Sequence, residues 1–277
     1  MSHFDEDFRE FTESGCDRAA FIGRFFDGRG IESFTMPVEG RNHIYVKFPS
    51  GGYNPMFRIK TVIAHYDRVS GSPGANDNSA AVFRMMQWAA ELASGSDFHN
   101  VRLLFTDGEE LSENGVSSQG SYNLAVLFRK LGIVNDDVFV FDCMGRGTVP
   151  VICDVRIPRN AGAKFRRDYA FLERRAEKIL SEASPGRWLK LPSSMSDNAG
   201  FLANGIPAVA FTMLPAAEAE TYLNSIVRGD GTDIPRTWRL IHTSGDDVDS
   251  LDPEAFVMTG RILDALARQK TPAVNII

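Results

Sequence analysis

The sequence predicts an α/β fold, a three-layer α/β/α sandwich with a mixed, mainly parallel sheet. Short apolar runs of strand length alternate with longer stretches in which apolar residues recur every three or four positions. The 277 residues are enough for one large α/β domain, and the hydrophobic content of 43% is ordinary for a globular protein. We therefore expect a single domain over residues 1–277, with excursions at the rim of the sheet at about 157–195 and 213–237.

The apolar patterns place the individual elements along the chain. An amphipathic helix over residues 5–28 should end at a glycine-rich stop. A helix over 77–94 has Asp77 and Ser79 at its start, where helix caps and first-turn acids belong. The strands are expected within 42–52, 56–66, 100–106, 137–145 and 206–214, and the other helices within 120–132, 164–184 and 253–269.

Composition excludes several classes of protein. The net charge of −6 gives no support for nucleic-acid binding, which normally shows a basic patch. No apolar run approaches the roughly 18–20 residues of a membrane span. The acidic N-terminus lacks the basic and apolar regions of a secretory signal, so we expect a cytoplasmic protein. The cysteines Cys16, Cys143 and Cys153 lack metal-finger spacing and are expected to be reduced, packed thiols.

Polar side chains collect at the ends of the predicted strands, the edge where reactive loops lie in such sheets. Those of interest are His65, Asp67, Asp77, Glu109, Glu110, Asp142 and, late in the chain, His242. Each alone has a bland explanation: a His-x-Asp triplet is easily a structural hydrogen-bonded pair, and an acid before a helix is easily a cap. Together, the two histidines and three of these five carboxylates would form the nitrogen and oxygen set that suits zinc or a similar divalent ion. One carboxylate would then bridge two ions about 3.5–4 Å apart.

Four segments resemble the signature segments of the family-28 metallopeptidases of clan MH. They are AHYDRVSGSPGANDNSA (64–80), FTDGEE (105–110), FDCMG (141–145) and IHTSGDDVDSLD (241–252). This family contains co-catalytic zinc aminopeptidases similar to aminopeptidases S and Y and to bacterial leucyl aminopeptidase. The resemblance runs in order from about residue 42 to 268, and it implies a zinc-exopeptidase fold of the phosphorylase/hydrolase-like type.

The resemblance also implies a role for each matching residue. His65 and Asp142 resemble ligands of one zinc, Glu110 and His242 resemble ligands of the other, and Asp77 resembles the bridging carboxylate. Asp67 matches the acid that orients the first histidine. Glu109 matches the general base, so that adjacent glutamates would divide their duties between proton transfer and metal binding. Asp107 lies outside this set, and we expect it to shape the loop by hydrogen bonds to backbone amides.

The chain departs from the family pattern around the substrate. Asn198 stands where histidine is common, and Ile241 precedes the last ligand where some relatives have a tyrosine, for which Tyr222 is a candidate substitute. The candidate substrate-binding residues are Met195, Asp197, Phe201 and Met213. The apolar ones, with Phe211, form either a hydrophobic pocket or part of the core.

We therefore expect a metal-dependent aminopeptidase that acts on a peptide or amino-acid derivative with two divalent ions, zinc being the expected metal. Another dizinc exopeptidase or amidohydrolase stays open: a dipeptidase, a carboxypeptidase-type enzyme or an acyl-amino-acid hydrolase. A glutaminyl-cyclase-like transferase is a further alternative, but His65 together with Glu110 favours a two-metal hydrolase. A non-catalytic binding homologue is opposed by the presence of all five ligands.

Overall fold

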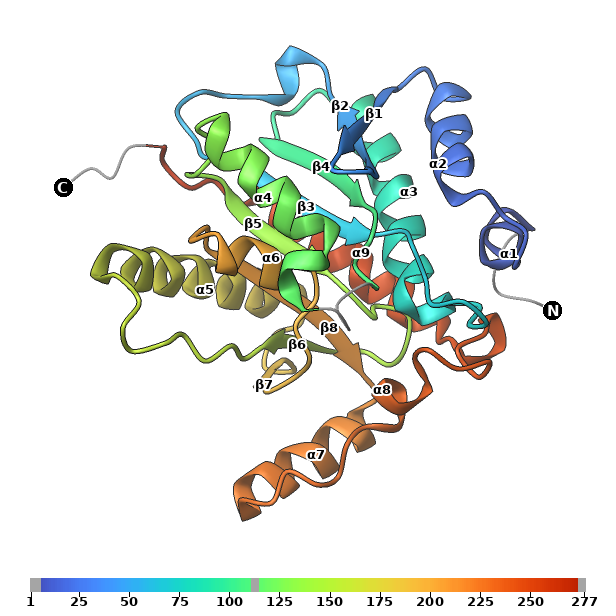
Figure 1. The fold of residues 1–277 in the computed structure, drawn as a ribbon, viewed down its shortest axis with the longest axis vertical. Coiled ribbons are helices and arrows are strands. Elements are labelled where there is room, and N and C mark those ends of the chain that lie inside the picture. The colour runs from blue at the N-terminus through green and yellow to red at the C-terminus, as the bar shows by residue number, and fades with distance from the viewer. Residues whose placement is uncertain (1–5, 111–114, 274–277) are drawn as a thin grey trace.

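The computed structural model describes residues 6–110 and 115–273, which contain one eight-stranded sheet in the order β1-β2-β4-β3-β5-β8-β6-β7 (Figure 1). The strands are β1 (Glu32–Val38), β2 (Arg41–Lys47), β3 (Lys60–His65), β4 (Val101–Thr106), β5 (Asp137–Phe141), β6 (Val149–Cys153), β7 (Leu189–Leu191) and β8 (Ala208–Leu214). The central strands β4, β3, β5 and β8 are parallel to one another. The hairpin β1-β2 and the pairing of β6 with β8 are antiparallel. The predicted mixed, mainly parallel sheet is confirmed.

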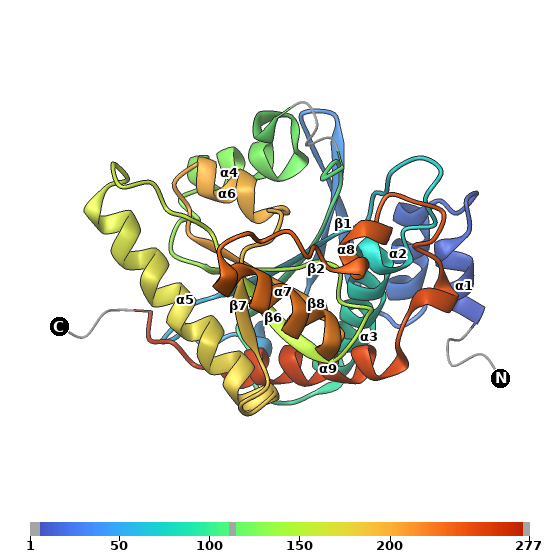
Figure 2. The same ribbon diagram turned by 90° about the horizontal axis from the view of Figure 1, so that it is seen from below.

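Helices cover both faces of this sheet. They are α1 (Glu6–Thr12), α2 (Arg18–Asp27), α3 (Ala80–Ser94), α4 (Gly120–Lys130), α5 (Ala163–Ala183), α6 (Asn198–Ala203), α7 (Ala216–Arg228), α8 (Arg236–Leu240) and α9 (Pro253–Arg268). The pair α4 and α6 packs on one face, whereas α2, α3, α5 and α9 pack on the other (Figure 2). The helices α7 and α8 follow β8 beyond its carboxyl end (Figure 1).

The two faces of the central strands are both apolar, as a buried parallel sheet requires. In β3 every residue is buried. Val62 and Ala64 belong to the core under α3 and α9, while Ile63 between them packs with Leu124 of α4 on the opposite face. This period of two fixes which side chains enter each core and leaves the carboxyl ends of the strands for polar residues.

The structure corrects several element boundaries. The single helix expected over 5–28 is two helices, α1 and α2, in its described part. Asp17 is the N-cap of α2, since its side chain accepts a hydrogen bond from the Ala20 amide at 3.0 Å. Strands β1 and β6 were not predicted, and each contains a proline, Pro37 and Pro150, which argues against a strand in a sequence.

The expected rim segments contain regular structure as well. The segment 157–195 holds α5 and the short edge strand β7, and 213–237 includes the end of β8 together with α7. The assignment of the whole chain to a single domain stays a prediction. In the part of the chain that the structure describes, no helix is both long and apolar enough to cross a membrane.

Candidate metal centre and active site

The site lies at the carboxyl ends of three neighbouring strands, β4, β3 and β5. His65 is the last residue of β3 and pairs with Thr106, the last residue of β4. Asp142 directly follows β5. The chain passes from β3 to β4 on one side and then to β5 on the other side of β3, so the direction of winding reverses at this strand. Such a reversal opens a crevice at the carboxyl ends of the strands, where α/β sheets bind ligands.

Asp77 lies between the two histidines. Its Oδ1 is 3.2 Å from Nε2 of His65, and its Oδ2 is 3.2 Å from Nε2 of His242. Asp142 Oδ1 lies 3.7 Å from Nε2 of His65, and Glu110 Oε2 lies 2.9 Å from Nε2 of His242. The donor atoms therefore form two groups that share Asp77: His65, Asp77 and Asp142, and Asp77, Glu110 and His242.

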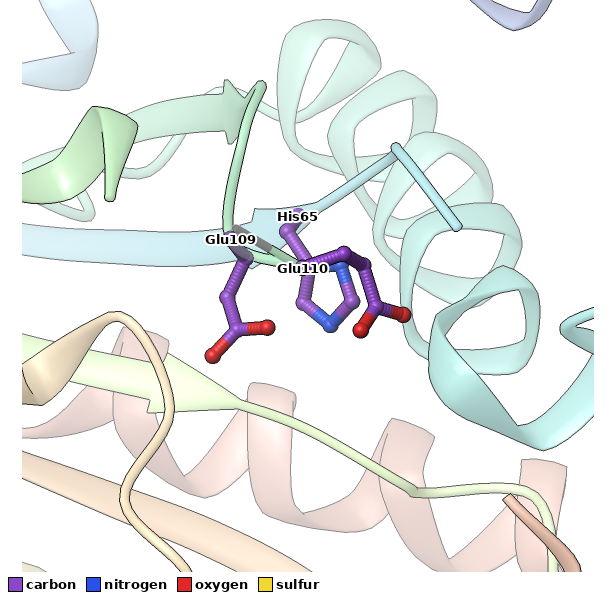
Figure 3. A group of neighbouring side chains, drawn as sticks. All are labelled: His65, Glu109 and Glu110. Carbon is purple, nitrogen blue, oxygen red and sulfur yellow. The ribbon is translucent and has the colours of Figure 1, made fainter. Parts of the chain in front are cut away.

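The adjacent glutamates occupy different positions in this cluster. Their carboxylates lie on either side of the His65 ring (Figure 3). Glu110 faces His242, whereas Oε1 of Glu109 accepts a hydrogen bond from the side-chain amide of Gln119 at 3.0 Å. Glu109 lies near His65 and Glu110 but outside the two groups that share Asp77. The local structure thus separates a candidate base from a candidate ligand.

The residues present fit a divalent cation. Both imidazole nitrogens of His65, Oε1 of Glu110 and Oδ1 of Asp142 are buried without a hydrogen-bond partner among the described residues. A buried polar atom without a partner costs free energy that coordination of an ion would recover. Imidazole and carboxylate donors together are the set that zinc and similar ions prefer.

The pKa shifts show an excess of negative charge at the same place. Burial would lower the pKa of His65, but the carboxylates of Asp142, Asp67 and Asp77 raise it well above its usual value. Hydrogen bonds to Asp77 and Glu110 raise the pKa of His242 to about 10. Burial raises the pKa of Glu109 well above its ordinary range. Dications would neutralise this concentration of carboxylates.

The segment that carries Asp77 is not part of the expected helix. The α-helix begins at Ala80, and Ala75–Ser79 form a wider turn in which Asp77 has non-helical dihedral angles (φ −112°, ψ 86°). The peptide bond that follows Asp77 is cis. The amides on either side hold this turn to the end of β5. Asn76 Oδ1 accepts from the Gly145 amide at 2.8 Å, and Asn78 Nδ2 donates to the Phe141 carbonyl at 2.8 Å.

Two further carboxylates organise the loops. Asp67 Oδ1 lies 3.5 Å from Nδ1 of His65, and the same carboxylate accepts the amides of Glu109 and Glu110 at 3.2 and 3.1 Å. Asp246, which the sequence did not single out, accepts the Asn76 and Asp77 amides at 2.8 and 3.1 Å. Its place four residues after His242 was the one available signal, since acceptance of a backbone amide leaves no sequence pattern.

The substrate-contact prediction needs correction. Phe201 and Met213 are fully buried in the core, because they lie on the faces of α6 and β8 that pack against the other layers. Asp197 is also fully buried and accepts a hydrogen bond from the Thr106 hydroxyl. Met195 is 47% exposed and lines the cavity beside the metal cluster. Asp107 accepts the Asn42 amide at 2.9 Å, which is the loop-shaping contact we expected.

The cavity beside the cluster has a volume of about 460 Å³. It is lined by Asp77, Glu109, Asp142, Cys143, Cys153, Pro192, Ser193, Ser194, Met195, Ser196, Ala210, Thr212, Tyr222, Ile234, Trp238, Ile241 and His242. No lysine or arginine is among these described lining residues. Tyr222 forms part of the wall, but its hydroxyl donates to the Pro192 carbonyl at 3.0 Å. A larger cavity, about 630 Å³, lies beside the start of α5 and contains none of the predicted site residues.

An α/β sandwich that gathers histidines and carboxylates at the carboxyl ends of its central strands, beside an open cavity, belongs to the class of metallohydrolases. More specifically, the chain belongs to peptidase family M28, whose family model matches residues 46–267. The predicted membership of the family-28 metallopeptidases is confirmed.

Solved structures show the same fold. The chain resembles the Legionella pneumophila LapA aminopeptidase (TM-score 0.66, 16% identity, 95% of this chain and 69% of that chain). It also resembles BSAP, a zinc aminopeptidase from Bacillus subtilis, with a TM-score of 0.58 and 21% identity. That match covers 81% of this chain and 48% of BSAP, so the chain spans about half the length of that protein. A glutaminyl cyclase from Porphyromonas gingivalis is similar along nearly its whole length, with a TM-score of 0.64, 14% identity and 96% of both chains covered. No curated protein shows significant sequence similarity to the chain.

Proposed function

We propose that the protein is a metal-dependent aminopeptidase that holds two divalent ions. The observation that carries the proposal is the position of Asp77, which presents one carboxylate oxygen to each of two histidines at 3.2 Å. His65 and Asp142 would hold one ion, Glu110 and His242 the other, and Asp77 both. Zinc is the expected metal, and it is the metal named for the B. subtilis neighbour.

The chemistry divides between the ions and the protein. When bound, such ions lower the pKa of a water molecule and polarise the scissile carbonyl. The carboxylate of Glu109 accepts the proton of the attacking water and returns it to the leaving amine. Gln119 holds one oxygen of that carboxylate, which leaves the other free for the proton. Asp67 fixes the orientation of the His65 ring and the position of the Glu109–Glu110 backbone.

The charge of the cavity supports removal of an N-terminal residue. A free α-amine can coordinate an ion or donate hydrogen bonds to Asp77, Glu109 or Asp142, which all line the cavity. A substrate with a free carboxylate at the scissile residue would find no lysine or arginine among the described lining residues to pair with it. This arrangement opposes carboxypeptidase-type and acyl-amino-acid hydrolysis. The apolar wall, which includes Met195 and Trp238, favours an apolar first residue.

The test compares matched substrates on one metal-loaded preparation. Aminoacyl-p-nitroanilides with a free amine should be cleaved, and their N-acetylated counterparts should show a kcat/KM at least about tenfold lower, because the blocked amide is desolvated without a partner. Equal rates, or preference for the acetylated member, would refute the aminopeptidase and favour the acyl-amino-acid hydrolase.

A glutaminyl-cyclase activity is the second candidate, because that neighbour matches the chain over 96% of both lengths. The same preparation should be given a peptide with N-terminal glutamine. Release of free glutamine supports the aminopeptidase, whereas cyclisation with release of ammonia supports the cyclase. The cytoplasmic location stays a prediction from the sequence.

A further inference from the structure

We propose that Arg18 is a positioning residue of the metal centre, whose guanidinium fixes the loop between His65 and Asp77. The inference rests on the proposed metal-dependent function. Arg18 is the first residue of α2, and it precedes the segment 46–267 that the family model matches. The two N-terminal helices therefore supply part of the support for the site.

The guanidinium of Arg18 is buried, with the residue 5% exposed, and it donates to six acceptors. Nη1 donates to the carbonyls of Tyr66 (3.0 Å) and Asp67 (3.4 Å). Nη2 donates to the carbonyls of Pro73 (2.9 Å) and Gly74 (3.4 Å) and to Ser79 Oγ (2.7 Å). Nε donates to the carbonyl of Phe11 (3.3 Å). An arginine side chain has five N–H donors in a fixed planar fork, so all of its capacity is used.

Five of these six acceptors lie at the two ends of one loop. Tyr66 and Asp67 directly follow the proposed ligand His65, whereas Pro73 and Gly74 precede Asp77 and Ser79 follows it. The loop has no strand or helix between β3 and the turn that begins at Ala75. One planar cation therefore sets the distance between the two backbone segments on which the proposed ligands are mounted.

Gly74 shows how closely the two groups approach. It has a positive φ of 60°, and a Cβ at this position would lie 2.6 Å from the Asp77 carbonyl oxygen and 3.4 Å from Nη2 of Arg18. A side chain here would clash with the Asp77 carbonyl and displace the turn that carries Asp77.

A second arginine, Arg68, lies on the loop itself and links the loop to α1. Arg68 donates to the carbonyls of Thr12 (2.8 Å) and Glu13 (2.7 Å), at the end of α1, and to that of Pro73 (3.0 Å). Pro73 thus accepts from both arginines, and the end of α1 is tied to the same loop. Arg18 of α2 thus donates to the proposed metal loop, and Arg68 of that loop donates to the end of α1.

The packing of the N-terminal helices rests mainly on apolar side chains and only in part on this guanidinium. Phe8, Phe11, Ile22 and Phe26 are buried in the main core, with Phe8 and Phe83 rings in edge contact at 5.2 Å. Loss of the guanidinium should therefore loosen the loop while the helices stay docked. The guanidinium carbon of Arg18 lies 5.0 Å from the centre of the Phe11 ring, and in Arg18→Met an apolar side chain of similar length takes its place.

The experiment compares Arg18→Met and Arg18→Lys with Arg24→Met, a control on the same helix. Arg24 is exposed and pairs with Glu10 at the surface. Metal affinity is measured by competition with a chelator, and the visible spectrum of bound Co²⁺ reports the ligand geometry. Both Arg18 variants should bind metal about 10–100-fold more weakly, as is typical for residues that orient ligands. Lysine should not restore affinity, since three donors on a point charge cannot serve two backbone segments.

Folded Arg18 variants with the parent's affinity and cobalt spectrum would overturn the inference and leave Arg18 a purely structural role. If Arg18→Met fails to fold, Ser79→Ala removes one acceptor of the guanidinium and should still weaken metal binding severalfold, and unchanged affinity would count against the inference. A parent protein that binds no divalent ion would refute the proposed function, and this inference with it. Tight binding by the parent and by every variant refutes the inference alone.

Discussion

The side-chain amide of Gln119 donates to Oε1 of Glu109 at 3.0 Å, and both residues are buried. Gln119 precedes α4, whereas Glu109 follows β4, so the contact joins two segments on opposite sides of residues 111–114. Because the donor is an uncharged amide, it fixes the direction of the carboxylate without neutralising it.

Gln119→Leu should lower kcat by about 10–100-fold, since a hydrogen bond to a charged group contributes roughly 1.5–3 kcal/mol. KM and metal content should stay close to the parent values, because Gln119 is outside the proposed ligand set. Steady-state kinetics on metal-loaded enzyme, with metal content measured in parallel, tests this. A parental kcat would show that Glu109 needs no such support.

Glu109→Gln and Glu110→Gln should fail in different ways. The first keeps metal binding but loses at least about 10²–10⁴-fold in kcat, the usual contribution of a general base. The second should lower metal affinity as well as rate, because Glu110 faces His242 at 2.9 Å. Chelator competition and kcat measurements on both variants separate these effects. If Glu109→Gln kept a rate within a fewfold of the parent, Glu109 would not be the base.

The shared position of Asp77 predicts unequal effects on metal content. Elemental analysis of the parent should find more than one equivalent of divalent metal. Asp77→Asn should weaken both ions, because one oxygen faces each histidine, whereas Asp142→Asn should weaken only the ion held with His65. Titration of each metal-free variant with zinc gives the two affinities. Loss of a single equivalent in Asp77→Asn would contradict the bridging role.

The stability of the metal-free protein should fall on acidification, partly because of His99. Burial and then Lys60 lower the pKa of His99 to about 4, and its Nδ1 accepts the Val101 amide at 3.0 Å, so the native state holds a neutral ring. Between pH 6.5 and 4 the unfolded chain therefore binds a proton that the native state does not, and the free energy of unfolding falls as pH falls.

His99→Asn retains an oxygen acceptor for this amide and removes the titration. From pH 7 to 4.5, its free energy of unfolding in urea should fall less than that of the parent, by on the order of 1 kcal/mol. His43, whose pKa burial also lowers to about 4, remains in both proteins, so the acid-induced loss is reduced but not abolished. Parallel curves for the two proteins would show that folding does not lower the pKa of His99.

The sequence predicted the central strands and the cluster at their ends because both depend on local pattern. Apolar runs mark buried parallel strands, and polar residues directly after them must meet at one edge. Proline hid β1 and β6, and a cap at Asp17 divided the first helix. The approach of the strand ends brings His65 and Asp142 together whatever the details of the loops.

The supporting residues could not be predicted, because their partners are distant backbone groups. Arg18 reaches carbonyls 48 to 56 residues away, and Asp246 accepts amides about 170 residues away. No periodicity marks such contacts. Met213 shows a different limit: its neighbour Thr212 lines the cavity, and the period of two in β8 turns Met213 into the core.

One side of the cavity wall and the last proposed ligand belong to one continuous stretch of chain, residues 222–242. Tyr222, Ile234 and Trp238 line the cavity, α8 ends at Leu240, and His242 follows two residues later. Within the wall the rings of Tyr222 and Trp238 meet edge to face at 5.3 Å. An ion held by His242 would therefore fix the carboxyl-terminal end of the segment 222–242 beside the cavity. Substitution of side chains on this segment can then change selectivity, whereas a displacement of the whole segment would carry His242 away from its ion.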